Sequence, residues 1–340
     1  MNSYPPEVTT PPLPLVALLG HQEWHSTCRD FLRVHNKPPI NTISVSDPAQ
    51  ASRIFGERKA SFSALPNANF VKADWFVKHR QRSPAVAVVL LAREWVVGDP
   101  TSWTRACEQL DWVRTAARRR GARVAVAIVQ TSGPPSEVPE ERLIALRRRA
   151  DLEPKCLVSV SFEEGDSSLA RFGRVVAEQA SQFYADEIRR VHNKMIERAK
   201  VVPQPFFAFS LRSSFKQAAY SEFRQDWSGA LKHYQAAYRC AQEMAQSVGR
   251  GGGGVQRQAE LRAVSEQMHV KILSLMLYQQ RPGEALEQID RHIAAFRPPK
   301  GGGLLPPAAA AAAHWGWLSQ QYTVAGQLLS ERAGASAPPH

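Results

Sequence analysis

The chain has 340 residues, of which 44% are hydrophobic and 22% charged, and its formal net charge is +12. This length and composition are typical of a globular protein with two domains and exclude a wholly disordered chain. The longest apolar run, residues 85–92, is too short to cross a bilayer, and the uncharged, proline-rich start does not resemble a signal peptide. The basic excess favours an anionic partner without choosing among nucleic acid, anionic lipid and an acidic protein face.

Residues 1–14 are expected to form a disordered lead, and residues 15–165 an α/β domain. Short apolar segments predict five strands, at 15–19, 40–45, 85–92, 123–129 and 157–161. Apolar residues at helical spacing predict helices, at 23–34, 102–120 and 140–150. Residues 47–69 are expected to be irregular. Continuous apolar strands separated by helices are typical of a parallel sheet covered on both faces. We therefore expect a Rossmann-like, three-layer α/β domain with a mostly parallel sheet.

Two arginine triplets end predicted helices, at 118–120 and 147–149. Cations at these positions suit the negative end of the helix dipole, so helix-end solvation is the simpler interpretation. An anion-binding face is the alternative. Gly121 follows the first triplet and is expected to stop that helix.

The rest of the chain, residues 166–332, is predicted to be an all-α, tetratricopeptide-like solenoid. Helical spacing continues over four segments, at 168–200, 258–280, 284–296 and 308–332. Between the first two lies a helical hairpin at 206–245, which breaks at 224–226, where Asp226 is a good N-cap. Its two apolar faces need neighbouring helices to cover them, as in helical repeat arrays. Low-complexity loops are expected at 249–254 and 298–307, and a disordered tail at 333–340.

No motif for catalysis or cofactor binding occurs in the sequence. The strand ends lack both GxGxxG and GxxxxGK[ST], and no serine or cysteine has a recognisable base partner. His21, His25 and Cys28 share one helix face, but a zinc site would need a fourth ligand from elsewhere. The four cysteines have no CxxC spacing and are interpreted as reduced core thiols. We expect no enzyme activity, no cofactor and no metal. Nucleic-acid binding is not expected either, because no recognition motif accompanies the charge.

Two blocks of sequence resemble a known family. The first reads NFVKADWFVKH from residue 69 and continues into PAVAVVLL from residue 84. The second reads YADEIRRVH from residue 184 and continues through ALKHYQAAY at 230–238. In order and spacing they resemble the N-terminal half and foie gras region of the subunit 11 family of the trafficking protein particle complex. The resemblance covers residues 12–330, roughly, and the second block is the more specific.

This resemblance implies a non-enzymatic scaffold in a vesicle-tethering complex that acts between endoplasmic reticulum and Golgi. It implies other subunits of the complex as partners, an indirect link to a Rab GTPase, and a link to autophagy. A cytoplasmic protein peripheral to the Golgi and the ER–Golgi intermediate compartment is expected, with peripheral membrane contact at most. Family members continue into a β-rich C-terminal half. We therefore expect either that the chain is a fragment of something longer or that its helical end binds a partner.

Four residues are candidates for partner binding. Arg189 and Arg190 lie in the more specific block, with an internal ion pair to Asp186 or Glu187 as the alternative role. Trp315 and Trp317 lie in the last predicted helix, whose end is expected to be uncovered. Two other functions stay open: an α/β enzyme with an appended helical domain, which needs a polar pocket at the strand ends, and a basic peripheral binder of anionic membranes.

Overall fold

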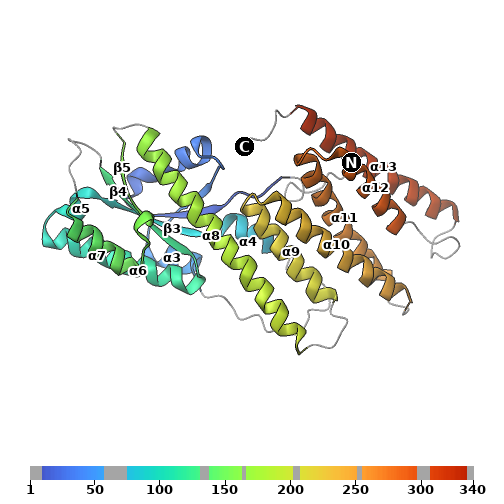
Figure 1. The fold of residues 1–340 in the computed structure, drawn as a ribbon, viewed down its shortest axis with the longest axis horizontal. Helices are drawn as coiled ribbons and strands as arrows, with labels where there is room; N and C mark the ends of the chain where they lie inside the picture. The colour runs from blue at the N-terminus through green and yellow to red at the C-terminus, as the bar shows by residue number, and fades with distance from the viewer. Residues whose placement is uncertain are drawn as a thin grey trace. The chain divides into compact units, whose positions relative to one another are not determined.

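A computed structural model describes the protein over residues 10–56, 75–130, 138–162, 166–201, 207–250, 255–296 and 307–334. It contains two compact units, Pro12–Glu187 and Ile188–His340. A parallel sheet organises the first unit and the second is built from helices (Figure 1). Within the described ranges, no helix is both long enough and apolar enough to span a membrane.

All five predicted strands are present and form one parallel sheet. They are β1 (Leu15–Gly20), β2 (Asn41–Ser44), β3 (Val86–Ala92), β4 (Arg123–Gln130) and β5 (Leu157–Ser161). The strand order is β2-β1-β3-β4-β5, with every neighbouring pair parallel. Every residue of the central strand β3 is buried, because helices cover both faces of the sheet. This double burial explains why its sequence is apolar without alternation.

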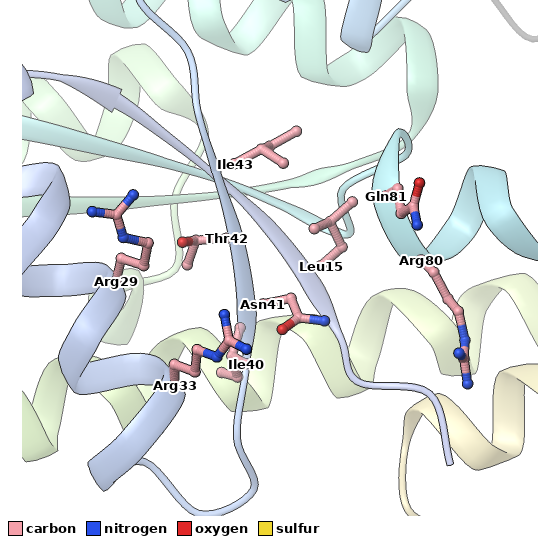
Figure 2. A pocket seen from close by; sticks show the side chains of 9 residues that line it. All are labelled: Leu15, Arg29, Arg33, Ile40, Asn41, Thr42, Ile43, Arg80 and Gln81. Carbon is pink, nitrogen blue, oxygen red and sulfur yellow. The ribbon is translucent and has the colours of Figure 1, made fainter. Parts of the chain in front are cut away.

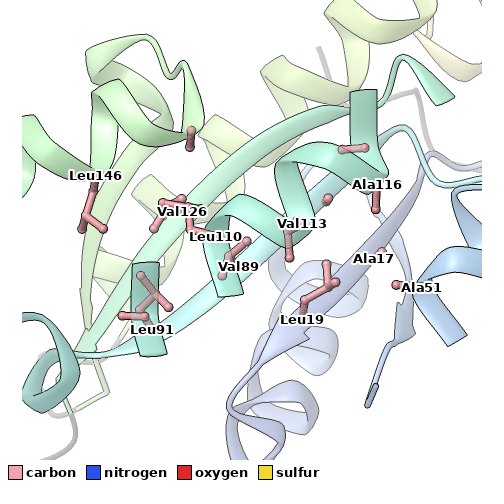
Figure 3. Close-up of a cluster of buried hydrophobic side chains, with 14 of the residues drawn as sticks. Ala17, Leu19, Ala51, Val89, Leu91, Leu110, Val113, Ala116, Val126 and Leu146 are labelled. Carbon is pink, nitrogen blue, oxygen red and sulfur yellow. The ribbon is translucent and has the colours of Figure 1, made fainter. Parts of the chain in front are cut away.

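One face of the sheet carries a buried apolar cluster (Figure 3). The helices on this side are α3 (Pro48–Ile54), α5 (Arg93–Val97), α6 (Pro100–Arg120) and α7 (Glu140–Ala150). Leu110 and Val113 of α6 belong to the same buried cluster as Val89 and Val126 of the sheet. The sequence sets both ends of α6: the Asp99 side chain accepts hydrogen bonds from two first-turn amides, and Gly121 ends the helix at φ 72°.

The opposite face is covered by the N-terminal helical segment and the first part of α8 (Asp166–Ala199). The segment comprises η1 (Gln22–Trp24), α2 (His25–Asp30) and the π-helical turn η2 (Phe31–His35). A β-carbon at Gly173 of α8 would lie 2.3 Å from Asn36 Oδ1, so a glycine lets α8 approach η2 closely. Arg123 of β4 and Asp186 of α8 form an ion pair at 2.7 Å, which joins the helix to the first residue of β4.

Three short helices were not expected from the sequence: α3, α5 and α4 (Trp75–Gln81). The expectation that residues 47–69 are irregular is wrong for 48–54, and residues 57–69 lie outside the described ranges. Asp47 accepts a hydrogen bond from the Gln50 amide at 2.7 Å, and Pro48 occupies the first helical position. This capping is enough to begin a two-turn helix.

In the described ranges, the second unit contains the end of α8, from Ile188, and five further helices: α9 (Phe207–Phe223), α10 (Trp227–Arg250), α11 (Val255–Tyr278), α12 (Pro282–Phe296) and α13 (Pro307–Gly334). α9, α10 and α11 each pack on the next helix in the chain, and α13 packs on α11. The hairpin predicted at 206–245 is confirmed: the Gly229 amide donates to Asp226 Oδ1 at 2.9 Å, so Asp226 caps α10. Tetratricopeptide-like geometry stays a prediction.

The predicted loops and termini lie mostly outside the described ranges. This holds for residues 1–9, 251–254, 297–306 and 335–340. Where the described part overlaps them, two corrections follow. Gly249 and Arg250 are helical, because α10 continues further than its last apolar residue, and Gly334 still belongs to α13.

The arginine triplets contact groups of their own fold. Arg118 donates to Asp151 and Arg149 to Asp111, both at 2.8 Å. Arg147 donates to Glu140 at 3.0 Å, and the buried Arg120 donates to the Ser83 hydroxyl. These bonds support the helix-end interpretation. Four members of the triplets are exposed, namely Arg118, Arg119, Arg148 and Arg149.

The four cysteines are free thiols, as expected. Cys28, Cys107 and Cys156 are buried, whereas Cys240 is half-buried. Burial raises the pKa of all four, and that of Cys28 to about 12. Each thiol is therefore held in its protonated, weakly reactive form.

Candidate functional site

The carboxyl ends of the strands are the place where an open α/β sheet usually binds its ligand. In this strand order the site would lie at the switch point between β1 and β3. Gly20 ends β1 with φ 98°, and a β-carbon there would lie 2.1 Å from the Leu90 carbonyl oxygen. The chain then turns so that the His21 ring stacks on Trp24 and lies beside Trp95, with ring centroids 4.5 and 5.0 Å apart. Aromatic rings therefore occupy the switch point.

A cavity of about 300 Å³ lies at the ends of β1 and β2, lined in part by Gly20 and Trp112. Asp47 and Glu108 bring carboxylates to it. Asp47 already accepts hydrogen bonds from the Gln50 amide and the Ser46 hydroxyl, and these bonds hold the pKa of Asp47 below its usual value. Its carboxylate thus acts as a helix cap. The Ser46 hydroxyl also lines the cavity, but the carboxylate to which it donates is the one that caps α3.

The histidine and cysteine face of α2 is part of the core. His25 and Cys28 are 4% and 1% exposed, and burial lowers the pKa of His25. Within the described ranges, no three histidine, cysteine or acidic side chains lie close enough together to hold a metal ion.

Arg189 and Arg190 lie on α8 in the helical unit. Arg189 is exposed and Arg190 is half-buried. Of the two acids considered as internal partners, Asp186 accepts from Arg123, and Glu187 is 5% exposed. A role of these arginines in partner binding stays a prediction.

The two candidate tryptophans of α13 have different surroundings. Trp315 is 69% exposed, whereas Trp317 is 8% exposed. Trp317 donates through Nε1 to Glu266, and the Arg262 guanidinium lies over its ring at 4.3 Å. The expectation that Trp317 is uncovered is therefore wrong, because α11 covers its side of α13. Two helical residues apart, the tryptophans point to nearly opposite sides.

An exposed apolar stripe runs along α13 from Trp315. Tyr322 is 56% exposed and Leu329 is 41% exposed. Trp315, Tyr322 and Leu329 follow one another at intervals of seven residues, so they lie on one side of the helix. Only Trp315 was singled out from the sequence, although the seven-residue spacing marks all three. A contiguous exposed apolar stripe is typical of a protein contact surface.

A buried ion pair links three helices of the same unit. Lys271 Nζ of α11 donates to Glu222 Oε1 of α9 at 2.9 Å, and the Tyr234 hydroxyl of α10 donates to Glu222 Oε2 at 2.7 Å. Glu222 and Lys271 are 1% and 5% exposed. These contacts join side chains of three different helices and so help to fix the register of α9, α10 and α11.

A pair of histidine rings stacks in the same unit. His269 of α11 and His292 of α12 lie 4.0 Å apart and almost parallel. The Tyr238 hydroxyl shares a hydrogen bond with His292 Nδ1 at 2.8 Å, and Trp317 packs against the same ring. Burial lowers the pKa of His269 to about 2 and that of His292 to about 3. Both rings are therefore neutral at pH 7.

These helices are the part of the chain that a family model matches. The model described as "Foie gras liver health family 1" matches residues 257–338, which contain most of α11 and all of α12 and α13. The exposed stripe of α13, His269, His292 and Lys271 all lie within the match.

Three curated relatives are similar over most of the chain, and each is named trafficking protein particle complex subunit 11. The relative from Gallus gallus is 27% identical over 283 residues, which are 81% of this chain and 23% of the relative. Those from Bos taurus and Homo sapiens are 26% and 25% identical over 346 residues, which cover 96% of this chain and 29% of each relative. The chain thus spans less than a third of the length of these relatives.

Proposed function

We propose, from the homology of this chain to trafficking protein particle complex subunit 11, that it is a scaffold subunit of a vesicle-tethering complex. The observation that carries the proposal is similarity over 81–96% of the chain, across both units. The helical unit offers exposed surfaces for other subunits, and the sheet unit presents aromatic rings where an α/β enzyme would bind its substrate. The proposed role needs no catalysis.

The finer features of the role follow from the same homology. The complex would act in transport between endoplasmic reticulum and Golgi, and other subunits of the complex would be the direct partners. Its links to a Rab GTPase and to autophagy would be indirect, through the assembled complex. The protein would be cytoplasmic and peripheral to the Golgi and the ER–Golgi intermediate compartment.

Affinity purification of the tagged chain from its own cells, followed by mass spectrometry, tests this proposal. We expect other subunits of a trafficking protein particle complex to be recovered in fixed proportion to the bait. Recovery of none of them, with the bait folded and soluble, contradicts the proposal.

Charge reversal at Arg189 and Arg190 is expected to reduce the recovery of partner subunits. An interfacial arginine at a hot spot contributes about 2 kcal/mol or more, so recovery should fall roughly tenfold or further. Arg171→Glu with Arg174→Glu is the matched control, since both residues are exposed on the same helix and the charge change is equal. If the two double variants bind partners equally well, Arg189 and Arg190 have no role in binding. Thermal unfolding of both shows whether the fold is intact.

Trp315→Ser is expected to reduce partner recovery while leaving the unfolding temperature unchanged. The ring is mostly exposed, so its loss removes little packing within the chain, whereas a tryptophan buried in an interface contributes about 2 kcal/mol or more. Leu286→Ser is the control, because Leu286 is another exposed apolar residue of the helical unit, at 58%. Equal recovery with Trp315→Ser and Leu286→Ser would exclude the stripe of α13 as the contact surface.

A further inference from the structure

Strand β2 is the outermost strand on its side of the sheet, and among the described residues no strand pairs with its outer side. β2 pairs with β1 on one side and is the last strand in the order. Asn41 and Val45 donate their amides to Pro14 and Leu18, both at 2.9 Å. Because successive residues of a strand point their amide and carbonyl groups in opposite directions, those of Thr42 point away from β1.

Hydrogen bonds within the fold occupy the backbone groups at the two ends of this edge. Thr42, in the middle of the strand, is therefore the position where a partner chain could pair. The Ile40 amide donates to the Leu32 carbonyl at 2.9 Å. At the other end, the Gln50 side chain donates to the Ser44 carbonyl at 3.3 Å. The Thr42 hydroxyl oxygen between them is buried and has no hydrogen-bond partner.

Arginines flank the same edge on both sides (Figure 2). A cavity of about 230 Å³ runs along β2, with Arg29 and Arg33 on one side of the strand and Arg80 on the other. No carboxylate is among the described residues that line it. Asp30 lies 3.7 Å from Arg29, in a solvent-exposed contact that offsets little of the positive charge. The surroundings of this edge therefore favour an anionic occupant.

We propose that the β2 edge binds an extended acidic peptide segment of a partner protein, which adds to the sheet as a sixth strand. Main-chain hydrogen bonds to Thr42 would hold the segment, and its carboxylates would face the three arginines. A peptide suits the site better than a phosphate group or an anionic lipid surface, since it offers both a donor for the Thr42 carbonyl and an acceptor for its amide. This docking site lies on the sheet unit and does not depend on the scaffold role proposed for the helical unit.

The test is fluorescence anisotropy of the full chain with a fluorescein-labelled eight-residue peptide of alternating glutamate and valine. We expect saturable binding that weakens at least about tenfold in Arg29→Glu with Arg33→Glu, since each hydrogen bond between charged groups contributes roughly tenfold in affinity. Arg119→Glu with Arg148→Glu is the matched control, because it makes the same charge change at exposed residues of α6 and α7. Its affinity should stay within about threefold of the unaltered chain.

Backbone pairing is tested separately at Thr42. Thr42→Pro removes the outward amide of an edge strand, a position where proline is tolerated, and should weaken binding by about fivefold or more, whereas Thr42→Val should not. A peptide N-methylated at alternate residues should also bind more weakly to the unaltered chain, which settles the point even if Thr42→Pro fails to fold by circular dichroism.

Four results would overturn the proposal. The first is no binding of the peptide at about 1 mM, and the second is that the control charge variant binds the peptide as weakly as Arg29→Glu with Arg33→Glu. The third is that the N-methylated peptide binds as tightly as the unmodified one. The fourth is that phosphatidylserine vesicles bind in an arginine-dependent way while the peptide does not bind. The last would assign the arginines to a lipid surface. None of these results bears on the recovery of other subunits through the helical unit, so the two proposals fail separately.

Discussion

Lys271→Met is expected to destabilise the helical unit by about 3–5 kcal/mol, the range observed when one partner of a buried ion pair is removed. The Glu222 carboxylate would keep its hydrogen bond from Tyr234 but would lose the cation that balances its charge. Urea denaturation followed by circular dichroism measures the loss. Hydrogen exchange should show it as faster exchange in α9, α10 and α11, which the three side chains link.

A second variant separates the charge effect from packing. Glu222→Gln combined with Lys271→Met removes both charges and keeps an oxygen for the Tyr234 hydroxyl, so it should recover most of the lost stability. Lys232→Met makes the same change at an exposed position of α10 and should alter stability by less than about 0.5 kcal/mol. If Lys271→Met is as mild as Lys232→Met, the ion pair does not hold these helices together.

Acid is expected to weaken the same unit well above the pH at which most carboxylates titrate. The unfolded chain protonates His269 and His292 near pH 6.5, whereas the folded rings stay neutral until about pH 2 and 3. The unfolded state therefore binds more protons below pH 6.5, and stability falls as the pH falls. Between pH 6.5 and 4.5 the loss is up to about 2.7 kcal/mol for each ring.

His292→Gln should reduce the slope of this loss, because one of the buried rings with a lowered pKa is gone. The free energy of unfolding, measured by urea denaturation at half-unit steps of pH from 7 to 4.5, gives the slope directly. His192→Gln is the control, since His192 is exposed on α8 and should leave the slope unchanged. A slope that is the same in the unaltered chain and in His292→Gln would show that His292 does not stay neutral in the folded state.

The sequence predicted the sheet and most helices well, for physical reasons that act locally. A strand covered on both faces must be apolar throughout, so β3 and β4 stand out as unbroken apolar segments. Gly121 and Asp226 end and begin helices by backbone chemistry that depends on a few neighbouring residues. The short helix α4 was missed, since seven residues carry too little periodicity to tell a helix from a loop.

The candidate sites could be predicted only in part, because they depend on contacts between distant residues. Trp315 and Trp317 are alike in sequence, and α13 has apolar residues on several sides, so periodicity does not tell which side meets α11. Glu222 and Lys271 are 49 positions apart and look like ordinary surface charges in the sequence. The exposed edge at β2 follows from the strand order, which no single segment of sequence determines.

The burial of the four native thiols has a practical consequence for spectroscopy. Because their raised pKa values and low exposure slow alkylation, a cysteine introduced at an exposed position of the folded chain would be the fastest to react with a maleimide dye. Ser319 or Lys232 could then carry a single fluorophore without removal of any native cysteine. Half-buried Cys240 is the one native thiol to check, by mass spectrometry of the labelled chain.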